Sequence, residues 1–597
     1  RARARAHRRD GRHGHGRIHR RADGADTRSR PRHHDPAGLR MPLLDRRIGL
    51  LFAVFLVLLS AAFARALYFG TIRGGSLAQA AATQQVATDI VPARRGTITD
   101  RNGDELAVSE QSATIIANPY LIKDPGSAAK ALAPLLAMGE DAVLRAITKP
   151  KSGYVVVRRQ VPGVNADRIS GLKIEGITQE ASERRIYPRG LLAAQVLGIV
   201  GRDDNGVAIG REGLEYSRDR ILAGTAGKRR TLRDALGQPL QVDELQHAKP
   251  GAHLQLTLDA AIQERAENVL AQVGAKYRPK SATAVVLDPK TNEVLAMANW
   301  PRVDANDPAG APAEARQNRS VALTYEPGST FKAFTVAGAL EDGQITPDTV
   351  FDLPPTIQVA DRTIGESHAR PAEALTTSQI LAQSSNVGAI KIGLGLGKTR
   401  FDHWVRQFGF GKPTGVDLPG EERGIIKPVS EYSGSSMGNL PIGQGESVTS
   451  LQMATAYSAI ANGGVLRKPR LVRRVNGRLV PRTKGKRIIS ERVSGQVRQM
   501  LEGVFNPGGT AAEVNIPGYQ LAGKTGTANK VDAKTGQYSQ ANYVASFVGF
   551  APAHDPRLLI SVMVDEPQGA IYGGVVAAPA FGDIASFALG YLRIPPK

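Results

Sequence analysis

Three short motifs carry side chains that together could perform serine acyl transfer. They read Ser-Thr-Phe-Lys at 329–332, Ser-Ser-Asn at 384–386 and Lys-Thr-Gly-Thr at 524–527. A serine hydroxyl becomes a good nucleophile when a neighbouring base takes its proton, and a lysine three residues later lies close to one helical turn away. The first motif therefore predicts a nucleophile, Ser329, with Lys332 as its general base.

Two of these patterns occur twice, so spacing and setting must select the functional copies. Ser-Gly-Leu-Lys at 170–173 also fits the first motif, and Lys-Thr-Gly at 534–536 also fits the third. The distance from Ser329 to Ser384 is 55 residues, whereas from Ser170 it is 214. We therefore choose the compact set.

The sequence around Ser329 predicts a buried helix. Glu-Pro-Gly at 326–328 breaks the chain before it, and a mostly apolar run at 333–340 is ended by Asp-Gly at 342–343. Apolar surroundings disfavour the charged form of a lysine, so Lys332 can serve as a base. For an isolated motif the alternative is an N-cap serine with a surface lysine.

The Ser-Ser-Asn motif forms a polar break between apolar stretches, as expected of a loop that reaches into a cleft. If the segment is extended, Ser384 and Asn386 point the same way and Ser385 points elsewhere. Ser384 could then relay a proton, and Asn386 could donate to a substrate amide carbonyl. A polar helix cap is the alternative interpretation.

The Lys-Thr-Gly-Thr motif follows a short strand-like run at 519–523, whereas its second copy lies in a polar stretch. A strand edge here would present the Lys524 ammonium together with the hydroxyls of Thr525 and Thr527. Gly526 would allow close approach of a substrate backbone. Such a platform suits a peptide that ends in a carboxylate.

The three motifs in this order resemble those of class B penicillin-binding proteins, which are peptidoglycan D,D-transpeptidases. The resemblance covers nearly everything from about residue 94 to residue 581. Within the family the chain is most similar to the cell-division subgroup, the FtsI or penicillin-binding protein 3 type. Further segments that carry the resemblance lie at 95–103, 185–190, 198–201, 213–215, 443–445, 461–464 and 545–550.

The resemblance implies a catalytic role for five side chains. Ser329 would form the acyl-enzyme, Lys332 would act as its base, and Ser384 would shuttle the proton to the leaving D-alanine. Asn386 would hold the donor stem peptide, and Lys524 would supply positive potential.

The resemblance also implies the groups that bind around the reacting carbonyl. Thr525 and Thr527, with Gly526 between them, would bind the terminal carboxylate or the equivalent group of a β-lactam. The backbone amides of Ser329 and Thr527 would form the oxyanion hole, which generally contributes most of the barrier lowering in acyl transfer. No metal or cofactor is implied, and the chain has no cysteine and no clustered histidines after its first forty residues.

The implied fold is α/β, a penicillin-binding transpeptidase fold in which an antiparallel sheet is sandwiched by helices, preceded by an elongated α+β pedestal. A helical pattern at 260–273 and a hairpin pattern at 281–298 agree with its start. Apolar strands at 544–550 and 558–564 should pair beside the Lys524 strand. The predicted domains are a basic, disordered cytoplasmic tail at 1–45, a transmembrane helix at 46–69, a linker at 70–88, the pedestal or dimerisation domain at 89–250 and the transpeptidase domain at 251–597.

A membrane span is predicted near the N-terminus. The uncharged run 48–64, extended through Phe69 if Arg65 snorkels, gives 22 residues. At about 1.5 Å per residue this length crosses a hydrocarbon core of about 30 Å. Arg46 and Arg47 place the N-terminus in the cytoplasm and the catalytic domain outside the cell membrane. A cleaved signal peptide is the alternative, although its apolar region would normally be about 7 to 15 residues.

The first forty residues hold 13 arginines against 4 aspartates, so they supply +9 of the net charge of +22. No stripe of basic and aromatic residues accompanies the rest, and nucleic-acid binding is not expected. The segment has no apolar period and cannot form a core. Because 41–47 resembles an ordinary start of an anchored protein, we expect residues 1–40 to come from a misplaced gene start, a genuine disordered tail being the alternative.

The predicted function is cross-linking of stem peptides during septal wall synthesis, with covalent inhibition by β-lactams. The sequence shows no glycosyltransferase motif, so the resemblance implies a SEDS-family polymerase of the FtsW type and other divisome proteins as partners. Elongation-type transpeptidase and D,D-carboxypeptidase are the enzymatic alternatives, and a penicillin sensor or inactive scaffold is the alternative from another class. A sensor should carry several spans, and a β-lactamase should add a Glu-x-x-Leu-Asn motif, which the sequence lacks between the second and third motifs.

Overall fold

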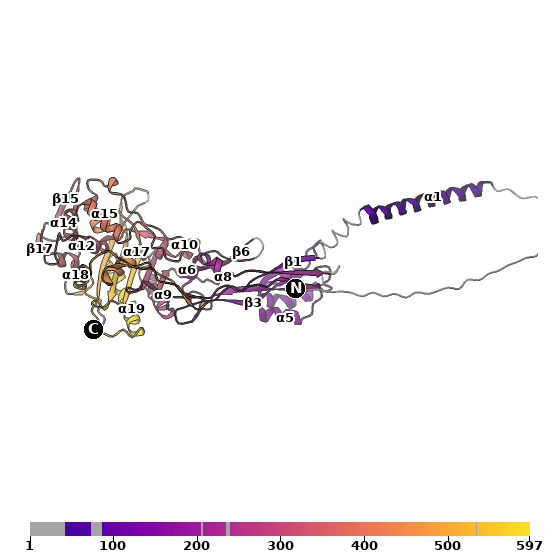
Figure 1. Ribbon diagram of the computed structural model, residues 1–597, viewed down its shortest axis with the longest axis horizontal. Coiled ribbons are helices and arrows are strands. Elements are labelled where there is room, and N and C mark those ends of the chain that lie inside the picture. The colour runs from indigo at the N-terminus through magenta and orange to yellow at the C-terminus, as the bar shows by residue number, and fades with distance from the viewer. Residues whose placement is uncertain (1–41, 73–85, 204–206, 234–238, 533, 597) are drawn as a thin grey trace, which may run out of the picture. The chain divides into compact units, whose positions relative to one another are not determined.

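The computed structural model describes residues 42–72, 86–203, 207–233, 239–532 and 534–596 (Figure 1). The chain divides into two compact units, Arg1–Val86 and Ala87–Lys597. Most of the predicted basic tail and most of the predicted linker lie outside the described residues.

The first unit contains one long apolar helix, α1 (Pro42–Leu67), followed by the π-helical turn η1 (Tyr68–Ile72). From Arg47 to Ile72 none of this helical stretch is buried, and by length and composition it could cross a membrane. The helix overlaps the residues 46–69 for which a span is predicted. The C-terminal helix α19 (Gly573–Tyr591) passes the same test, but most of it is buried in the second unit.

The centre of the second unit is a five-stranded antiparallel sheet in the order β12-β11-β25-β24-β23. The hairpin predicted at 281–298 is formed by β11 and β12. The strands predicted at 544–550 and 558–564 are β24 and β25, and β24 pairs with β23, the strand of Lys524. The strand that carries Lys524 stands at one edge of the sheet, as expected. The strands are β11 (Ser281–Asp288), β12 (Glu293–Trp300), β23 (Ala522–Val531), β24 (Tyr538–Ala551) and β25 (Leu558–Asp565).

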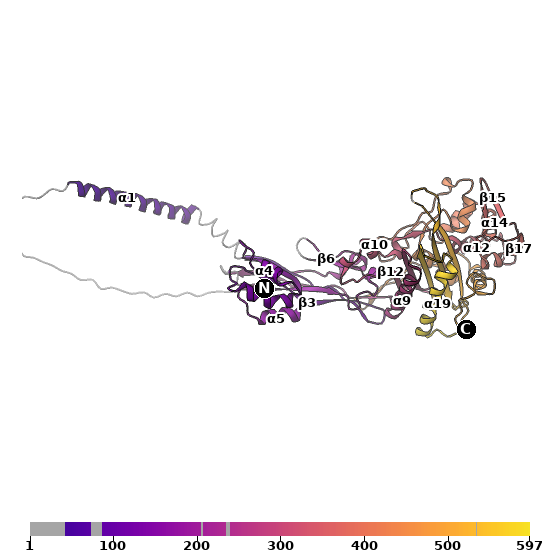
Figure 2. The ribbon, with the colours of Figure 1, turned by 180° about the vertical axis from the view of Figure 1, so that it is seen from behind.

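Helices cover both faces of this sheet. Alternate strand residues point to opposite faces, and in β11 they enter two different hydrophobic clusters. Ala284 and Val286 pack with α9 (Ala260–Tyr277) and α19, whereas Val285 packs in the cluster of the opposite face. Figure 2 shows α9 and α19 from behind. The sheet is therefore sandwiched, which confirms the predicted α/β fold.

On the opposite face, the helix that begins at the first motif is enclosed by other helices. In α12 (Lys332–Glu341) every residue but the last is buried. Phe334 contacts Tyr457, with ring centroids 5.2 Å apart. A helix that is apolar all round belongs in a core, as the run after Ser329 predicts. Packed against α12 are α13 (Thr377–Ala382), α14 (Asn386–Leu396), α15 (Lys398–Gln407) and α18 (Glu491–Glu502). Tyr457 belongs to α17 (Ser450–Ala461), and two short helices of this part of the unit are α11 (Arg319–Ala322) and α16 (Ser436–Asn439).

The preceding part of the second unit is built on a seven-stranded sheet in the order β21-β20-β10-β2-β3-β4, with β5 on β3. Strand β10 follows the boundary expected at residue 250, yet it pairs in parallel with β2 and antiparallel with β20. One sheet therefore joins strands from both sides of that boundary. The strands are β2 (Ile98–Thr99), β3 (Glu105–Ala117), β4 (Val155–Pro162), β5 (Ile177–Ile186), β10 (Leu254–Leu256), β20 (Val472–Val475) and β21 (Arg478–Leu479).

Smaller elements complete the unit. In the pedestal they are β1 (Val86–Val91), α3 (Pro125–Leu136), α4 (Glu140–Ile147), α5 (Gly163–Gly171), α6 (Ala194–Leu197), β6 (Val200–Arg202), β7 (Ala208–Gly210), α7 (Gly213–Ser217), α8 (Asp219–Leu222), β8 (Gly227–Arg233) and β9 (Pro239–Gln246). In the catalytic part they are α10 (Ala313–Arg316), β13 (Thr324–Tyr325), β14 (Val350–Leu353), β15 (Thr356–Val359), β16 (Arg362–Gly365), β17 (Glu373–Thr376), β18 (Val448–Thr449), β19 (Val465–Leu466) and β22 (Lys486–Arg487).

A buried charge cluster joins three of the pedestal segments that carry the family resemblance. The Glu215 carboxylate is fully buried between Arg95, at 2.5 Å, and Arg185, at 2.7 Å. A buried charge is tolerated only when it is paired, and removing one partner commonly costs about 3 to 5 kcal/mol. These segments therefore hold the pedestal together and carry no part of the acyl-transfer site.

Candidate acyl-transfer site

Ser329 lies in the 3-10 turn η3 (Gly328–Phe331), which leads directly into α12. A hydrogen bond to a distant segment holds the turn in place: the Gly328 N–H donates to the Gly443 carbonyl at 2.9 Å. Ser329 is partly exposed, whereas Lys332, one turn later, is 1% exposed. A ligand can therefore reach the serine while the lysine amine stays enclosed.

The Lys332 amine joins the first motif to the second. Its Nζ donates to the Ser384 carbonyl at 2.6 Å and to Asn386 Oδ1 at 2.7 Å, and it lies 3.4 Å from Ser384 Oγ. Among the residues that the structure describes, the amine makes no hydrogen bond to the Ser329 hydroxyl. Catalytic hydrogen bonds often form only when substrate is bound, and Lys332 follows Ser329 by one turn, as the assignment of the base requires.

The environment of Lys332 suits a base. Burial lowers the pKa of its amine to about 7, and it outweighs the Glu366 carboxylate, which raises the pKa. The Arg370 guanidinium lowers it further. Near neutral pH a large share of the amine is therefore unprotonated and can accept a proton.

The second motif has a different backbone from the extended one expected, so that expectation is wrong. Ser384 adopts the left-handed region with φ +62°, because α13 ends and α14 begins within a few residues. Ser385 caps α14, and its hydroxyl accepts from the Gly388 N–H at 2.9 Å. Ser384 and Asn386 still contact Lys332, while Ser385 points elsewhere, as predicted. The helix-cap alternative is thus correct for Ser385.

The third motif buries its lysine in the edge strand β23. Lys524 is fully buried, and its Nζ donates to the Thr525 carbonyl at 3.2 Å and to its hydroxyl at 3.4 Å. Burial and, second, the charge of Lys332 lower the pKa of Lys524 well below its usual value. A carboxylate bound beside it would favour the protonated form.

Glycines allow the first and third motifs to meet. A Cβ at Gly328, where φ is +56°, would lie 2.9 Å from the Thr527 carbonyl oxygen, and one at Gly526 would lie 2.8 Å from the Pro327 carbonyl oxygen. Real Cβ atoms do not approach so closely, so only glycine permits this contact. The turn that carries Ser329 therefore lies against Thr527. The Thr527 hydroxyl accepts from the Gly573 N–H at 3.1 Å.

The second copies of the motifs lie on the surface. Ser170 is exposed in α5, and Lys173 is exposed just beyond that helix. Lys534 and Thr535 are exposed in the turn between β23 and β24, where their backbone N–H groups donate to the Asp532 carboxylate. The structure therefore brings together the compact set that spacing selected.

Four polar residues around the motifs were not predicted, because no sequence pattern marks them. Glu366 accepts from the Asn386 N–H of the second motif, and Arg370 donates to Gln383, the residue before that motif. Thr510 shares a 2.7 Å hydrogen bond with the hydroxyl of Thr525. Glu326, three residues before the nucleophile, accepts from the Gly445 N–H and the Tyr538 hydroxyl; the only sequence signal is its place beside the first motif.

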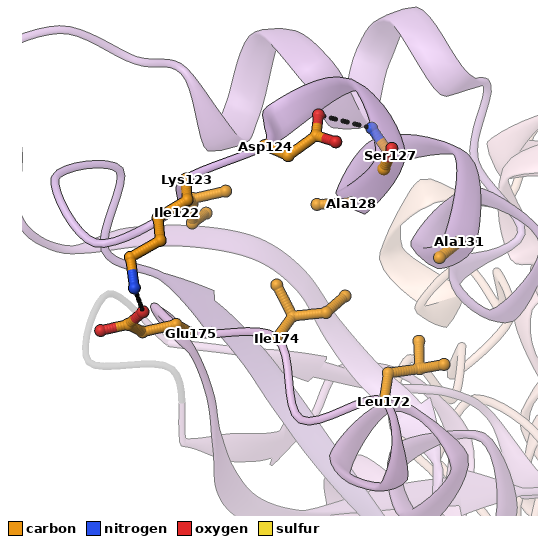
Figure 3. A pocket seen from close by; sticks show the side chains of 9 residues that line it. All are labelled: Ile122, Lys123, Asp124, Ser127, Ala128, Ala131, Leu172, Ile174 and Glu175. Carbon is orange, nitrogen blue, oxygen red and sulfur yellow. Dashed lines mark hydrogen bonds and ion pairs between the residues drawn. The ribbon is translucent and has the colours of Figure 1, made fainter.

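A hollow in the pedestal is chemically different from this site (Figure 3). Its polar contacts are an exposed ion pair between Lys123 and Glu175, at 2.8 Å, and the cap of α3, in which Asp124 accepts from the Ser127 N–H. The remaining lining is apolar: Ile122, Ala128, Ala131, Leu172 and Ile174.

Across the described part of the chain, no group of three or more His, Cys, Asp or Glu residues could hold a metal ion.

Comparison with known proteins gives matches over almost the whole second unit. Residues 282–586 match the penicillin binding protein transpeptidase domain, and residues 90–256 match the penicillin-binding protein dimerisation domain. The chain is 34% identical to the peptidoglycan D,D-transpeptidase FtsI of Escherichia coli K12, over 92% of both chains. It is 35% identical to the penicillin-binding protein PbpB of Mycolicibacterium smegmatis, over 88% of this chain and 87% of the relative.

A solved structure is similar over most of the chain. The crystal structure of penicillin binding protein 3 from Mycobacterium tuberculosis, complexed with ampicillin, gives a TM-score of 0.67 at 32% identity. The match covers 85% of this chain and 97% of that one.

Proposed function

Because the chain belongs to the penicillin-binding protein transpeptidase family, we propose that it is a peptidoglycan D,D-transpeptidase. It cross-links stem peptides through an acyl-enzyme on Ser329 and is acylated there by β-lactams. The observation that carries the proposal is the buried Lys332 amine, which contacts the second motif and lies one turn from the nucleophile. The names of relatives and a related structure complexed with ampicillin support the same activity.

In the acylation step, the Ser329 oxygen attacks the carbonyl carbon of the penultimate D-alanine of the donor peptide. Its proton passes to the Lys332 amine as the new C–O bond forms. The backbone N–H groups of Ser329 and Thr527 stabilise the oxyanion. The C–N bond then breaks, and Ser384 delivers a proton from Lys332 to the nitrogen of the leaving D-alanine.

In the second step, the amine of a neighbouring stem peptide attacks the ester. Its proton returns through Ser384 to Lys332, the C–O bond to Ser329 breaks, and the serine recovers its proton. If water attacks in place of the amine, the same site is a D,D-carboxypeptidase.

Binding groups orient the donor during both steps. Asn386 retains a second amide N–H, besides the one that donates to the Gly365 carbonyl at 3.0 Å, for a substrate carbonyl. Lys524, Thr525 and Thr527 bind the terminal carboxylate. Gly526 leaves room for the donor backbone along the edge strand.

The activity test uses purified chain with a donor stem peptide and an amine acceptor, followed by mass spectrometry of the products. A cross-linked peptide with release of D-alanine supports transpeptidation. Release of D-alanine with hydrolysis only indicates a carboxypeptidase. Labelling by a β-lactam without either product indicates a sensor, and no labelling indicates an inactive scaffold.

The proposed domain organisation follows the sequence: a basic tail at 1–45, a span at 46–69, a linker at 70–88, a pedestal at 89–250 and a transpeptidase domain at 251–597. The arginines before the span support the proposal of a cytoplasmic N-terminus and a catalytic domain outside the membrane. A chain without residues 41–72 should be soluble and still bind β-lactam. A mature N-terminus beyond Ala66 would instead reveal a cleaved signal peptide.

The finer cellular role is septal synthesis beside an FtsW-type SEDS glycosyltransferase and other divisome proteins. Resemblance to the FtsI type carries this assignment. Imaging a depleted strain tests it: filaments support division, and rounded cells indicate elongation.

A further inference from the structure

One carboxylate from outside the second motif holds the end of that motif, where α14 begins. Glu366 follows the hairpin of β15 and β16, and its side chain is 5% exposed. It accepts from the Ser385 hydroxyl at 2.5 Å, from the Asn386 N–H at 2.5 Å and from the Val387 N–H at 3.3 Å. These groups form the N-terminus of α14, where a negative charge is favourable.

A cation from the same loop holds the other side of the motif. Arg370 pairs with Glu366 at 3.1 Å and donates to Gln383 Oε1 at 3.1 Å. Gln383 is the residue immediately before Ser384. The loop therefore fixes the second motif at both ends, and the left-handed backbone of Ser384 lies between the two contacts.

The loop also determines much of the charge around Lys332. The charged groups acting on this amine are Glu366 and Arg370 from the loop, and Lys524 from β23. The neutral Ser384 and Asn386 accept its hydrogen bonds. Among these groups Glu366 supplies the negative charge, so it is the group that favours a proton on the amine.

We propose that Glu366 is a positioning residue for acyl transfer: its carboxylate fixes the turn at Ser384 and Asn386 against Lys332 and sets the pH at which acylation begins. The inference rests on the proposed transpeptidase function, and it adds a residue that no motif contains. Glu366 does not touch the substrate. It acts through the side chains that do.

The test compares Glu366→Gln with Glu373→Gln in the full chain. Glu373 is a matched control, because it also pairs with Arg370, at 3.3 Å, but it belongs to β17 and does not bind the motif. The rate constant of acylation by a fluorescent penicillin is measured across acidic to alkaline pH. At alkaline pH, Glu366→Gln should be slower by at least about tenfold, since it loses charge-assisted hydrogen bonds.

The pH profile separates positioning from a merely structural role. Removing the negative charge makes Lys332 lose its proton more readily, so the acid limb of Glu366→Gln should move to lower pH. Glu366→Asp keeps the charge and should keep the limb near the wild-type position, although its rate falls. Glu373→Gln should match wild type in both measures.

The proposal is overturned if Glu366→Gln reacts within about twofold of wild type, or if its limb does not move. If Glu366→Gln fails to fold, as judged by its thermal unfolding, Glu366→Asp decides the question. Because Glu366→Asp keeps the negative charge, a slower acylation rate with the acid limb at its wild-type position supports the proposal for that variant, and a wild-type acylation rate contradicts it. Wild-type protein that is not labelled at Ser329 would refute the proposed function itself, which is a different result.

Discussion

Two copies of Lys-Thr-Gly stand ten residues apart on one hairpin and differ in almost every physical respect. The copy that begins at Lys524 lies in the edge strand β23, with its lysine fully buried and its glycine against the turn of the nucleophile. The copy that begins at Lys534 lies in the exposed turn after β23, bound to the Asp532 carboxylate. The same three residues form an anchor in one place and a surface turn in the other.

The difference shows that burial and neighbours, and not residue types, create the chemistry of these motifs. Burial and the nearby Lys332 lower the pKa of Lys524, so a bound carboxylate would change its protonation. A lysine in a surface turn stays solvated whether or not a ligand is present. Ser329 and Ser170 differ in the same way, because only the former is followed by a buried lysine.

The largest contrast is expected between the two lysines of the Ser-x-x-Lys copies. Lys332→Ala should slow acylation by a β-lactam by roughly a hundredfold to ten-thousandfold, because the general base is lost. Lys173→Ala should leave the rate unchanged, since that side chain is exposed in the pedestal. Stopped-flow acylation rates check both, and similar rates for the two variants would contradict the assignment of the base.

The pH dependence of acylation tests the burial of Lys332. The amine must be neutral to accept the serine proton, and burial lowers its pKa to about 7. The rate should therefore rise about tenfold per pH unit well below that value and level off above it. A rate that keeps rising towards the usual lysine pKa of 10.5 would show that the amine is solvated.

A smaller contrast should separate the two copies of Lys-Thr-Gly. Lys524→Ala should slow acylation by at least about tenfold, since loss of a charged hydrogen bond commonly costs roughly 1.5 to 3 kcal/mol. Lys534→Ala should change little. Equal effects of the two substitutions on the acylation rate would remove the basis for distinguishing the copies.

The smallest expected effect concerns the threonine that supports the anchor. Thr510→Val removes the 2.7 Å hydrogen bond to Thr525 and should weaken β-lactam binding about threefold, with little change in the limiting rate. Thr535→Val is the control, because Thr535 occupies the place of Thr525 in the exposed copy of the motif. Saturation kinetics separate binding from rate, and an unchanged binding constant in Thr510→Val would exclude this supporting role.

Local sequence was sufficient for the elements that carry the first and third motifs. The apolar run after Ser329 has no polar face, so it had to become a buried helix. The apolar runs at 544–550 and 558–564 are long enough for core strands, and they form β24 and β25 beside β23. In these places hydrophobic pattern and tertiary packing favour the same structure.

Long-range contacts could not be predicted in this way. Strand β20 pairs with β10, which lies more than two hundred residues earlier, and no local period encodes that partner. Glu366 is one polar residue in the loop between β16 and β17, and its proposed role depends on the fold bringing it to the N-terminus of α14. The left-handed Ser384 was missed for a related reason, since two helices must meet within a few residues to force it.

The site of covalent attachment tests the assignment of Ser329 as the nucleophile most directly. Folded protein is treated with a labelled β-lactam, and the modified residue is identified by intact-mass measurement and peptide mapping. We expect one label, on Ser329, where the turn meets both companion motifs. A label on Ser170 or Ser384, or no label on folded protein, would contradict it.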